Sequence, residues 1–119
     1  MAMDPMQDLS WIAQMRKGCA EYSILAMLSG KEAYGYEILQ HLSKHETLTL
    51  GESTVYPLLS RLTREGFLTV QTRNSTSGPP RRYYRLTPAG RDRLQGMHDY
   101  WGNLVDSMST IKKEFSHER

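Results

Sequence analysis

Seven large apolar side chains recur near the end of the 119-residue chain, at alternating steps of three and four residues. Such steps form the a/d seam of a coiled-coil helix, and here they continue for three heptads. A long helix over 88–119 cannot bury this whole seam on one small domain, so the pattern predicts a second copy as partner. The seam can also pack on 9–28, and we expect both. The predicted dimer interface is Leu94, Met97, Trp101, Leu104, Met108, Ile111 and Phe115.

The composition suits one small domain and excludes several classes of protein. Apolar residues make up 39% and charged residues 24% of the chain, and no window approaches the ~18 apolar residues of a membrane span. Cys19 is the only cysteine, which excludes an intramolecular disulfide and a thiolate metal cluster. With no signal-peptide pattern, we expect a cytoplasmic protein. Residues 1–8, which begin like a cloning remnant, are expected to be a disordered N-terminus.

The net charge of +2 is unevenly distributed along the chain. Residues 51–95 hold eight arginines, no lysine and three acidic residues, for a net charge of +5, whereas residues 1–50 have a net charge of −2. The planar fork of arginine suits phosphates and guanine edges. This basic block indicates a nucleic-acid partner, with a merely solvated face as the alternative.

The hydrophobic spacing predicts three short helices followed by a hairpin and a long helix. The run 9–29 forms one helix or a broken pair with a bend near Gly18. Further helices are predicted over 33–45 and 53–65, with a short strand between them at Leu48-Thr49-Leu50. Strands over 67–73 and 81–87 flank a mobile turn at 74–80. Thr87 caps the last helix, with Pro88 at its first position.

The helix over 53–65 has one apolar and one polar face. Val55, Leu58, Leu59 and Leu62 fall on a single stripe. Ser53 or Thr54 is expected to cap its N-terminus, and Gly66 is expected to end it.

This order of elements predicts a mainly α-helical winged helix-turn-helix domain over 9–87, with a dimerisation helix over 88–119. In that fold the second helix of the turn presents polar side chains to the DNA major groove, and the hairpin reaches neighbouring phosphates. Tyr83 and Tyr84 should point to opposite sides of their strand. The predicted DNA-binding residues are Ser53, Thr54, Tyr56, Pro57, Ser60, Arg61, Arg64, Arg73, Gly78, Arg81 and Arg82.

Four sequence motifs stand out together. They are Tyr34-Gly35-Tyr36-Glu37-Ile38, the stretch 53–62 with its Tyr56-Pro57, Gly66-Phe67-Leu68, and the stretch 78–90 with Gly78-Pro79-Pro80 and Tyr83-Tyr84. In this combination they resemble the PadR family of bacterial transcription regulators, and the resemblance covers residues 9–115. The resemblance implies a homodimeric winged-helix repressor that binds a palindromic operator and releases it when a small effector binds.

Trp101 lies at the centre of the heptad seam and has two interpretations. It is either a packed core tryptophan or the aromatic wall of a ligand cavity between subunits. In drug-sensing members of the family that the chain resembles, the matching tryptophan stacks on flat aromatic compounds. Met97 would make such a pocket adaptable, so Trp101 and Met97 are the candidate ligand-binding residues.

The remaining candidate sites are weak. His41 and His45 are spaced for one metal ion but lack an obvious third ligand, and Cys19 is expected to be a small core residue rather than a redox sensor. We find no nucleophile–base pair, phosphate-binding glycine loop or carboxylate dyad, and predict neither an enzyme nor a cofactor. The alternatives are a winged-helix adaptor that binds proteins and a non-specific architectural DNA-binding protein.

Overall fold

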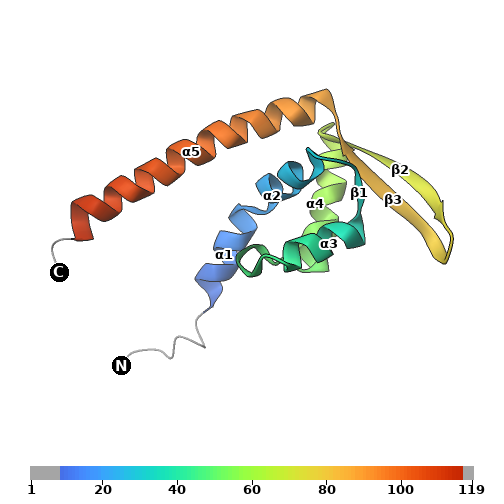
Figure 1. The fold of residues 1–119 in the computed structure, drawn as a ribbon, viewed down its shortest axis with the longest axis horizontal. Coiled ribbons are helices and arrows are strands. Elements are labelled where there is room, and N and C mark those ends of the chain that lie inside the picture. Colours follow the sequence, from blue (N-terminus) through green and yellow to red (C-terminus); the bar gives the residue numbers. More distant parts are fainter. Residues whose placement is uncertain (1–8, 117–119) are drawn as a thin grey trace.

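The computed structural model describes residues 9–116, so the N-terminus predicted at 1–8 and the last three residues of the predicted helix 88–119 lie outside the described residues. The five helices, one 3₁₀ helix and three strands within this range follow the predicted order, except that the short strand lies before the helix Gly35–Ser43 rather than after it. They are α1 (Ser10–Gly18), α2 (Ala20–Leu28), β1 (Ala33–Tyr34), α3 (Gly35–Ser43), the 3₁₀ helix η1 (Glu46–Leu48), α4 (Glu52–Arg64), β2 (Leu68–Ser75), β3 (Gly78–Leu86) and α5 (Pro88–Ser116) (Figure 1).

The helices and the hairpin build the predicted winged helix-turn-helix. α3 and α4 are its two central helices, and β2 and β3 form a hairpin that projects from them as the wing (Figure 1). The antiparallel sheet has the order β1-β3-β2. α4 therefore occupies the position of a recognition helix, next to the wing.

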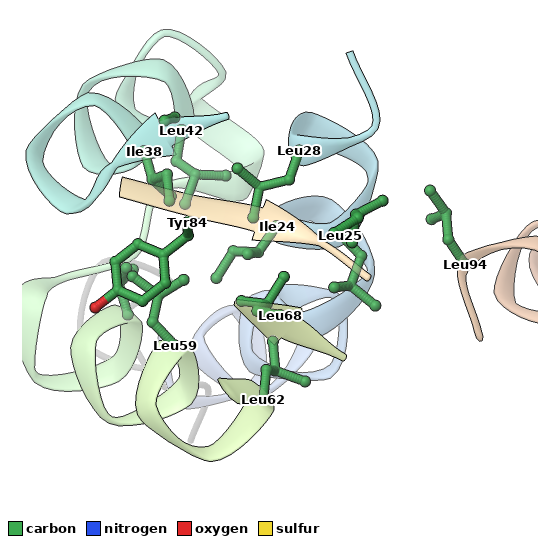
Figure 2. Packing of buried hydrophobic residues seen from close by; sticks show 13 residues of the cluster. Ile24, Leu25, Leu28, Ile38, Leu42, Leu59, Leu62, Leu68, Tyr84 and Leu94 are labelled. Carbon is green, nitrogen blue, oxygen red and sulfur yellow. The ribbon is translucent and has the colours of Figure 1, made fainter. Parts of the chain in front are cut away.

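The core fills the space between α2, α3, α4 and the base of the wing. Side chains from all of these elements meet there, and Leu94 joins them from α5 (Figure 2). The stripe predicted on α4 is confirmed, because Val55, Leu59 and Leu62 are fully buried and Leu58 is half-buried. Tyr84 turns into the core as one member of the predicted tyrosine split.

The strand predicted around Leu48-Thr49-Leu50 is wrong. Glu46–Leu48 form a 3₁₀ turn, and the following residues lead directly into α4. A strand needs a neighbouring edge for its backbone hydrogen bonds. Ala33–Tyr34 occupy that edge and pair with Tyr83 and Tyr84 of β3, so the short strand lies before α3 rather than after it.

The predicted cap of α4 is also wrong, whereas its predicted end is confirmed. The helix begins at Glu52 with Gly51 as N-cap, and neither Ser53 nor Thr54 supplies a capping side chain. Because the helix begins earlier, Ser53 lies exposed in its first turn. Gly66 adopts φ of +88°, the left-handed conformation that suits glycine at a helix end. The run 9–29 breaks after Gly18, giving α1 and α2.

The wing strands extend beyond their predicted bounds. β2 runs to Ser75 and β3 begins at Gly78, so the turn comprises two residues instead of seven. Pro79 and Pro80 therefore belong to β3. They are tolerated because β1 pairs with β3 only from Tyr83, which leaves that edge of β3 unpartnered near the tip.

The last helix begins as predicted and then leaves the domain (Figure 1). The Thr87 hydroxyl accepts a hydrogen bond from the Gly90 backbone N–H at 3.0 Å. Gly90 packs directly on the Phe67 carbonyl, where a Cβ atom would not fit. No helix within residues 9–116 is both long and apolar enough to cross a membrane.

Candidate nucleic-acid interface

The outer face of α4 carries the polar groups that the sequence assigned to DNA. With Val55, Leu59 and Leu62 anchored in the core, 3.6-residue periodicity turns the intervening positions outward. Thr54 is half-buried at the edge of this face. The exposed members are Ser53, Tyr56, Pro57, Ser60 and Arg64, and Arg64 forms no ion pair within the described part of the chain.

Arg61 does not join this outer surface. Its guanidinium turns toward α2, where Nη2 donates to Glu21 Oε1 at 3.1 Å. Nη1 donates to Glu65 Oε1 at 2.8 Å, one turn further along the helix. These hydrogen bonds raise the pKa of Arg61. The structure therefore separates Arg61 from the other predicted DNA-binding residues of α4.

The predicted arginine cluster of the wing is divided between two faces. Arg73 pairs with Arg81 across the hairpin, so both lie on the same face, whereas Arg82 follows Arg81 and lies on the other. The face of Arg82 continues into the buried Tyr84, which is the side that packs on the helices. Arg82 thus leaves its strand on the side that packs on the helices. Arg73 and Arg81 leave theirs on the opposite, outer side, although Arg81 also borders the cleft described below.

The outer side of the wing is held by Glu32, a residue that sequence reasoning missed. Glu32 Oε1 accepts hydrogen bonds from Arg73 Nη2 at 3.0 Å and from Arg85 Nη2 at 2.9 Å, and Oε2 accepts one from Arg73 Nη1. These bonds, first from Arg73 and then from Arg85, lower the pKa of Glu32 to about 2. Arg73 also lies over the Tyr83 ring at 4.6 Å. Glu32 therefore positions Arg73 and partly neutralises it.

A tyrosine-rich cleft separates α4 from the wing. Tyr36 and Tyr56 line it from the helices, and Arg81, Arg82 and residues of the wing tip, including Gly78, line it from the other side. Its volume is about 590 Å³. Hydroxyl and guanidinium donors from α3, α4 and β3 thus face one open space, as phosphate contacts require.

Close contacts of two tyrosines, Tyr56 and Tyr34, shape this cleft. The Tyr56 ring packs directly on Gly35, where an added Cβ atom would displace the ring. Burial, followed by the charge of Glu52, raises the pKa of the Tyr56 hydroxyl. At the outer edge, the guanidinium of Arg81 lies 4.5 Å from the centre of the Tyr34 ring. Tyr34 and Tyr36 therefore both border the cleft.

The charge distribution contains a signal for the two missed carboxylates. Residues 51–95 carry a surplus of arginines, whereas residues 1–50 carry the surplus of acids. Ion pairs between the two segments would neutralise both the surplus positive and the surplus negative charge. Glu21 and Glu32 supply these pairs, each between two arginines. The partners could not be assigned from the sequence because they lie 40 or more residues apart.

A second hollow lies between α5 and the pair α1–α2. It has a volume of about 830 Å³ and includes both candidate ligand-binding residues, Trp101 and Met97. Trp101 is 42% exposed and its ring centre lies 5.8 Å from that of Tyr22. The Tyr22 hydroxyl is hydrogen-bonded to His98 Nδ1 at 2.6 Å. Trp101 is thus neither a fully packed core residue nor isolated in solvent within this chain.

Cys19 lines the hollow beside Trp101, whereas His41 and His45 line neither of the two hollows described above. His41 and His45 are exposed. Within residues 9–116, no three histidine, cysteine or carboxylate side chains are arranged to hold a metal ion. Cys19 is half-buried between α1 and α2.

A helix-turn-helix with an arginine-bearing wing places the chain in the class of winged-helix transcription regulators. The family model described as "Transcriptional regulator PadR-like family" matches residues 24–96, and the chain belongs to this family. The resemblance carried by the sequence motifs is thereby confirmed.

Three comparisons with known proteins agree with this assignment. The negative transcriptional regulator PadR of Bacillus subtilis is 31% identical over 97 residues, covering 80% of this chain but 52% of the relative, so the chain spans about half of its length. A PadR family transcriptional regulator from Eggerthella lenta has a TM-score of 0.78 at 31% identity, covering 86% and 88% of the two chains. Bacillus subtilis PadR in complex with operator DNA has a TM-score of 0.61 at 31% identity, covering 68% and 45%.

Proposed function

We propose that this chain is a homodimeric, sequence-specific DNA-binding repressor whose recognition helix is α4. The observation that carries the proposal is the exposed polar face of α4, with Arg64 unpaired within residues 9–116, beside the Arg82 side of the wing. The α4 side chains would read base edges in the major groove, and Arg64, Arg81 and Arg82 would hold phosphates. The solved complex of its relative with operator DNA supports this use of the fold.

Self-association is proposed to occur through the distal half of α5. Trp101, Leu104, Met108, Ile111 and Phe115 all expose more than a third of their surface in the single chain. Trp11 and Met15 of α1 are exposed as well and add apolar surface on the neighbouring helix. A two-fold pair of α5 helices would cover these residues and set the distance between the two recognition helices.

We propose that a small flat aromatic compound causes release of DNA by binding in the hollow between α5 and the pair α1–α2. Trp101 and Met97 line this hollow, which is called the Trp101 groove below. A compound held there would change the angle at which α5 leaves the domain, and thereby the spacing of the two recognition helices. It can do so only if it binds the two arrangements with different affinities. The test is Trp101→Ala in protein that sedimentation shows to be dimeric and that still binds DNA, in which the DNA release caused by such compounds should be abolished.

Footprinting on the DNA upstream of the chain's own gene, with excess competitor DNA, tests the main proposal. A protected inverted repeat is the expected result. Protection that competitor DNA removes completely would favour a non-specific architectural protein. No protection at low salt, from folded protein, would favour a protein–protein adaptor.

Charge removal gives a matched second test. Arg64→Ala with Arg82→Ala should lower the affinity for the protected DNA roughly a hundredfold and reduce the slope of log affinity against log salt by about 2. The control is Lys17→Ala with Lys112→Ala, which removes two exposed charges from α1 and the distal half of α5. Equal losses in the two double variants would contradict a specific role for the α4–wing surface.

A further inference from the structure

One carboxylate links three helices that are distant in the sequence. Glu21, in the first turn of α2, accepts a hydrogen bond on Oε1 from Arg61 of α4 at 3.1 Å. Its other oxygen, Oε2, accepts from Nε of Arg93 on α5. The Glu21 side chain is 16% exposed, whereas both arginines expose about 40%. Each oxygen therefore serves a different helix, and the carboxylate itself is shielded from water.

This link connects α4 and α5, two helices that have few direct contacts with each other. α5 makes its principal contacts with α2 and with β3, and α4 makes its own with α3 and β2. The Arg93 guanidinium also lies over the Phe67 ring at 4.5 Å, which holds it close to the end of α4. A displacement of α5 would therefore reach α4 through Arg93, Glu21 and Arg61.

The same carboxylate borders the groove that contains Trp101. Glu21 and Arg93 both line this groove, together with Tyr22, the next residue along α2. Tyr22 in turn contacts Trp101 and His98. The groove and the recognition helix thus share one ion-pair cluster. Its Arg93 lines the groove, and its Arg61 belongs to α4.

We infer that Glu21 is the positioning residue that couples the Trp101 groove to the orientation of α4. The inference rests on the proposed function, because it assigns to one side chain the transmission between the groove and the DNA-binding surface. An occupant that shifts α5 would draw Arg93 from Glu21 Oε2. The carboxylate would then reorient, and Arg61 would lose its anchor on α2. By reciprocity, DNA that fixes α4 would favour the arrangement in which Arg93 donates to Glu21.

The molecule contains a matched control for this inference. Glu32 also bridges two arginines, but both arginines belong to the wing strands and none of the three residues is on α5. Glu21→Gln and Glu32→Gln remove the same charge from the same kind of cluster. A loss of general stability or a change in overall charge would affect both variants, whereas loss of coupling between α4 and α5 should affect only Glu21→Gln.

The first test needs no DNA and uses amide hydrogen exchange of the full chain. Glu21→Gln should accelerate exchange about tenfold in both the last turn of α4 and the first turns of α5. Glu32→Gln should accelerate it only in the wing. Arg93→Lys is a second variant that keeps the charge on α5 and serves if Glu21→Gln does not fold. It should likewise accelerate exchange in α4. Acceleration confined to the mutated helix, in either variant, would overturn the inference.

The second test follows Trp101 emission during DNA titration in a Trp11→Phe background, which leaves Trp101 as the single tryptophan. DNA protected in the footprint should change this emission in the parent protein and in Glu32→Gln, but not in Glu21→Gln. Equal changes in the two variants would contradict the inference while leaving DNA binding established. An absence of any DNA binding would instead refute the proposed function, and the exchange experiment would still decide the role of Glu21.

Discussion

The two halves of α5 share one heptad pattern but have different surroundings. In the first half, Gly90 and Leu94 are buried against the winged-helix domain, and Leu94 is only 5% exposed. In the distal half the same seam is open to solvent, and Phe115 is 67% exposed. Periodicity therefore identifies a face that must be covered, but it does not say which chain supplies the cover. The first half is an intramolecular interface, and the second is the proposed intermolecular one.

Alanine substitutions at the two ends of the seam should separate these interfaces most strongly. Leu94→Ala should lower the free energy of unfolding by about 2–4 kcal/mol, because it leaves a cavity in the domain core. This loss should not depend on protein concentration. The loss of stability in Ile111→Ala should instead increase as the protein concentration rises through the range of dimer formation. Urea unfolding at two protein concentrations measures both, and a concentration-independent loss at Ile111 would contradict the comparison.

A charged pair of substitutions in the distal half should dissociate the dimer without unfolding the domain. Leu104→Glu with Ile111→Glu places two carboxylates on the proposed seam, and we expect self-association to weaken roughly a hundredfold because those charges would be buried unpaired. Sedimentation across a concentration series measures the change. The circular dichroism spectrum should remain helical, since both side chains are exposed within the single chain. An unchanged dimer would place the interface elsewhere.

Glycine-to-alanine substitutions in the two halves of α5 should change the stability in opposite directions. Gly90→Ala should lower stability by about 1–3 kcal/mol, because the new methyl group would collide with the Phe67 carbonyl. Gly102 has no atom within 4 Å of the position of an added Cβ. Gly102→Ala should therefore raise stability by up to about 1 kcal/mol through its better helix propensity. Thermal unfolding of the two variants gives the comparison, and equal shifts would mean that the start of α5 is less tightly packed than described.

The smallest expected effect concerns pH and the Glu32 ion pairs of the wing, which include no residue of α5. The pKa of Glu32 falls from 4.5 to about 2 on folding, through hydrogen bonds from Arg73 and Arg85. Its contribution to stability is therefore present above pH 4.5 and is lost as the pH falls toward 2. The difference in unfolding free energy between the parent protein and Glu32→Gln should shrink from neutral pH to about pH 3. A difference that stayed constant over this range would show that the carboxylate does not act through its charge.

Much of the fold could be predicted because the relevant signals are local. The stripe of Val55, Leu59 and Leu62, the stop at Gly66 and the cap at Thr87 all depend on neighbours within one or two turns. The strand expected near Leu48 failed for the opposite reason. A strand exists only beside another strand, and the edge of β3 was taken by Ala33–Tyr34.

The candidate site was predictable in composition but not in arrangement. The residue types and their location on α4 and the wing followed from the sequence, including the exposed Ser53, Ser60 and Arg64. Arg61 and Arg73 had the same expected role, but their side chains turn to Glu21 and Glu32. An arginine spans several ångströms and can reach either solvent or a distant carboxylate. Its direction depends on which acid the fold brings near.

The sequence by itself determined the order of the elements, the apolar face of each helix, the basic character of residues 51–95 and the uncovered seam of α5, because these properties depend on spacing and composition along one chain. Tertiary structure alone decided which charges meet. It placed the acids of the first half between the arginines of the second, divided the wing arginines between two faces, and joined α4 to α5 through Glu21. Charge pairing depends on distance in space, and that distance exists only once the chain has folded.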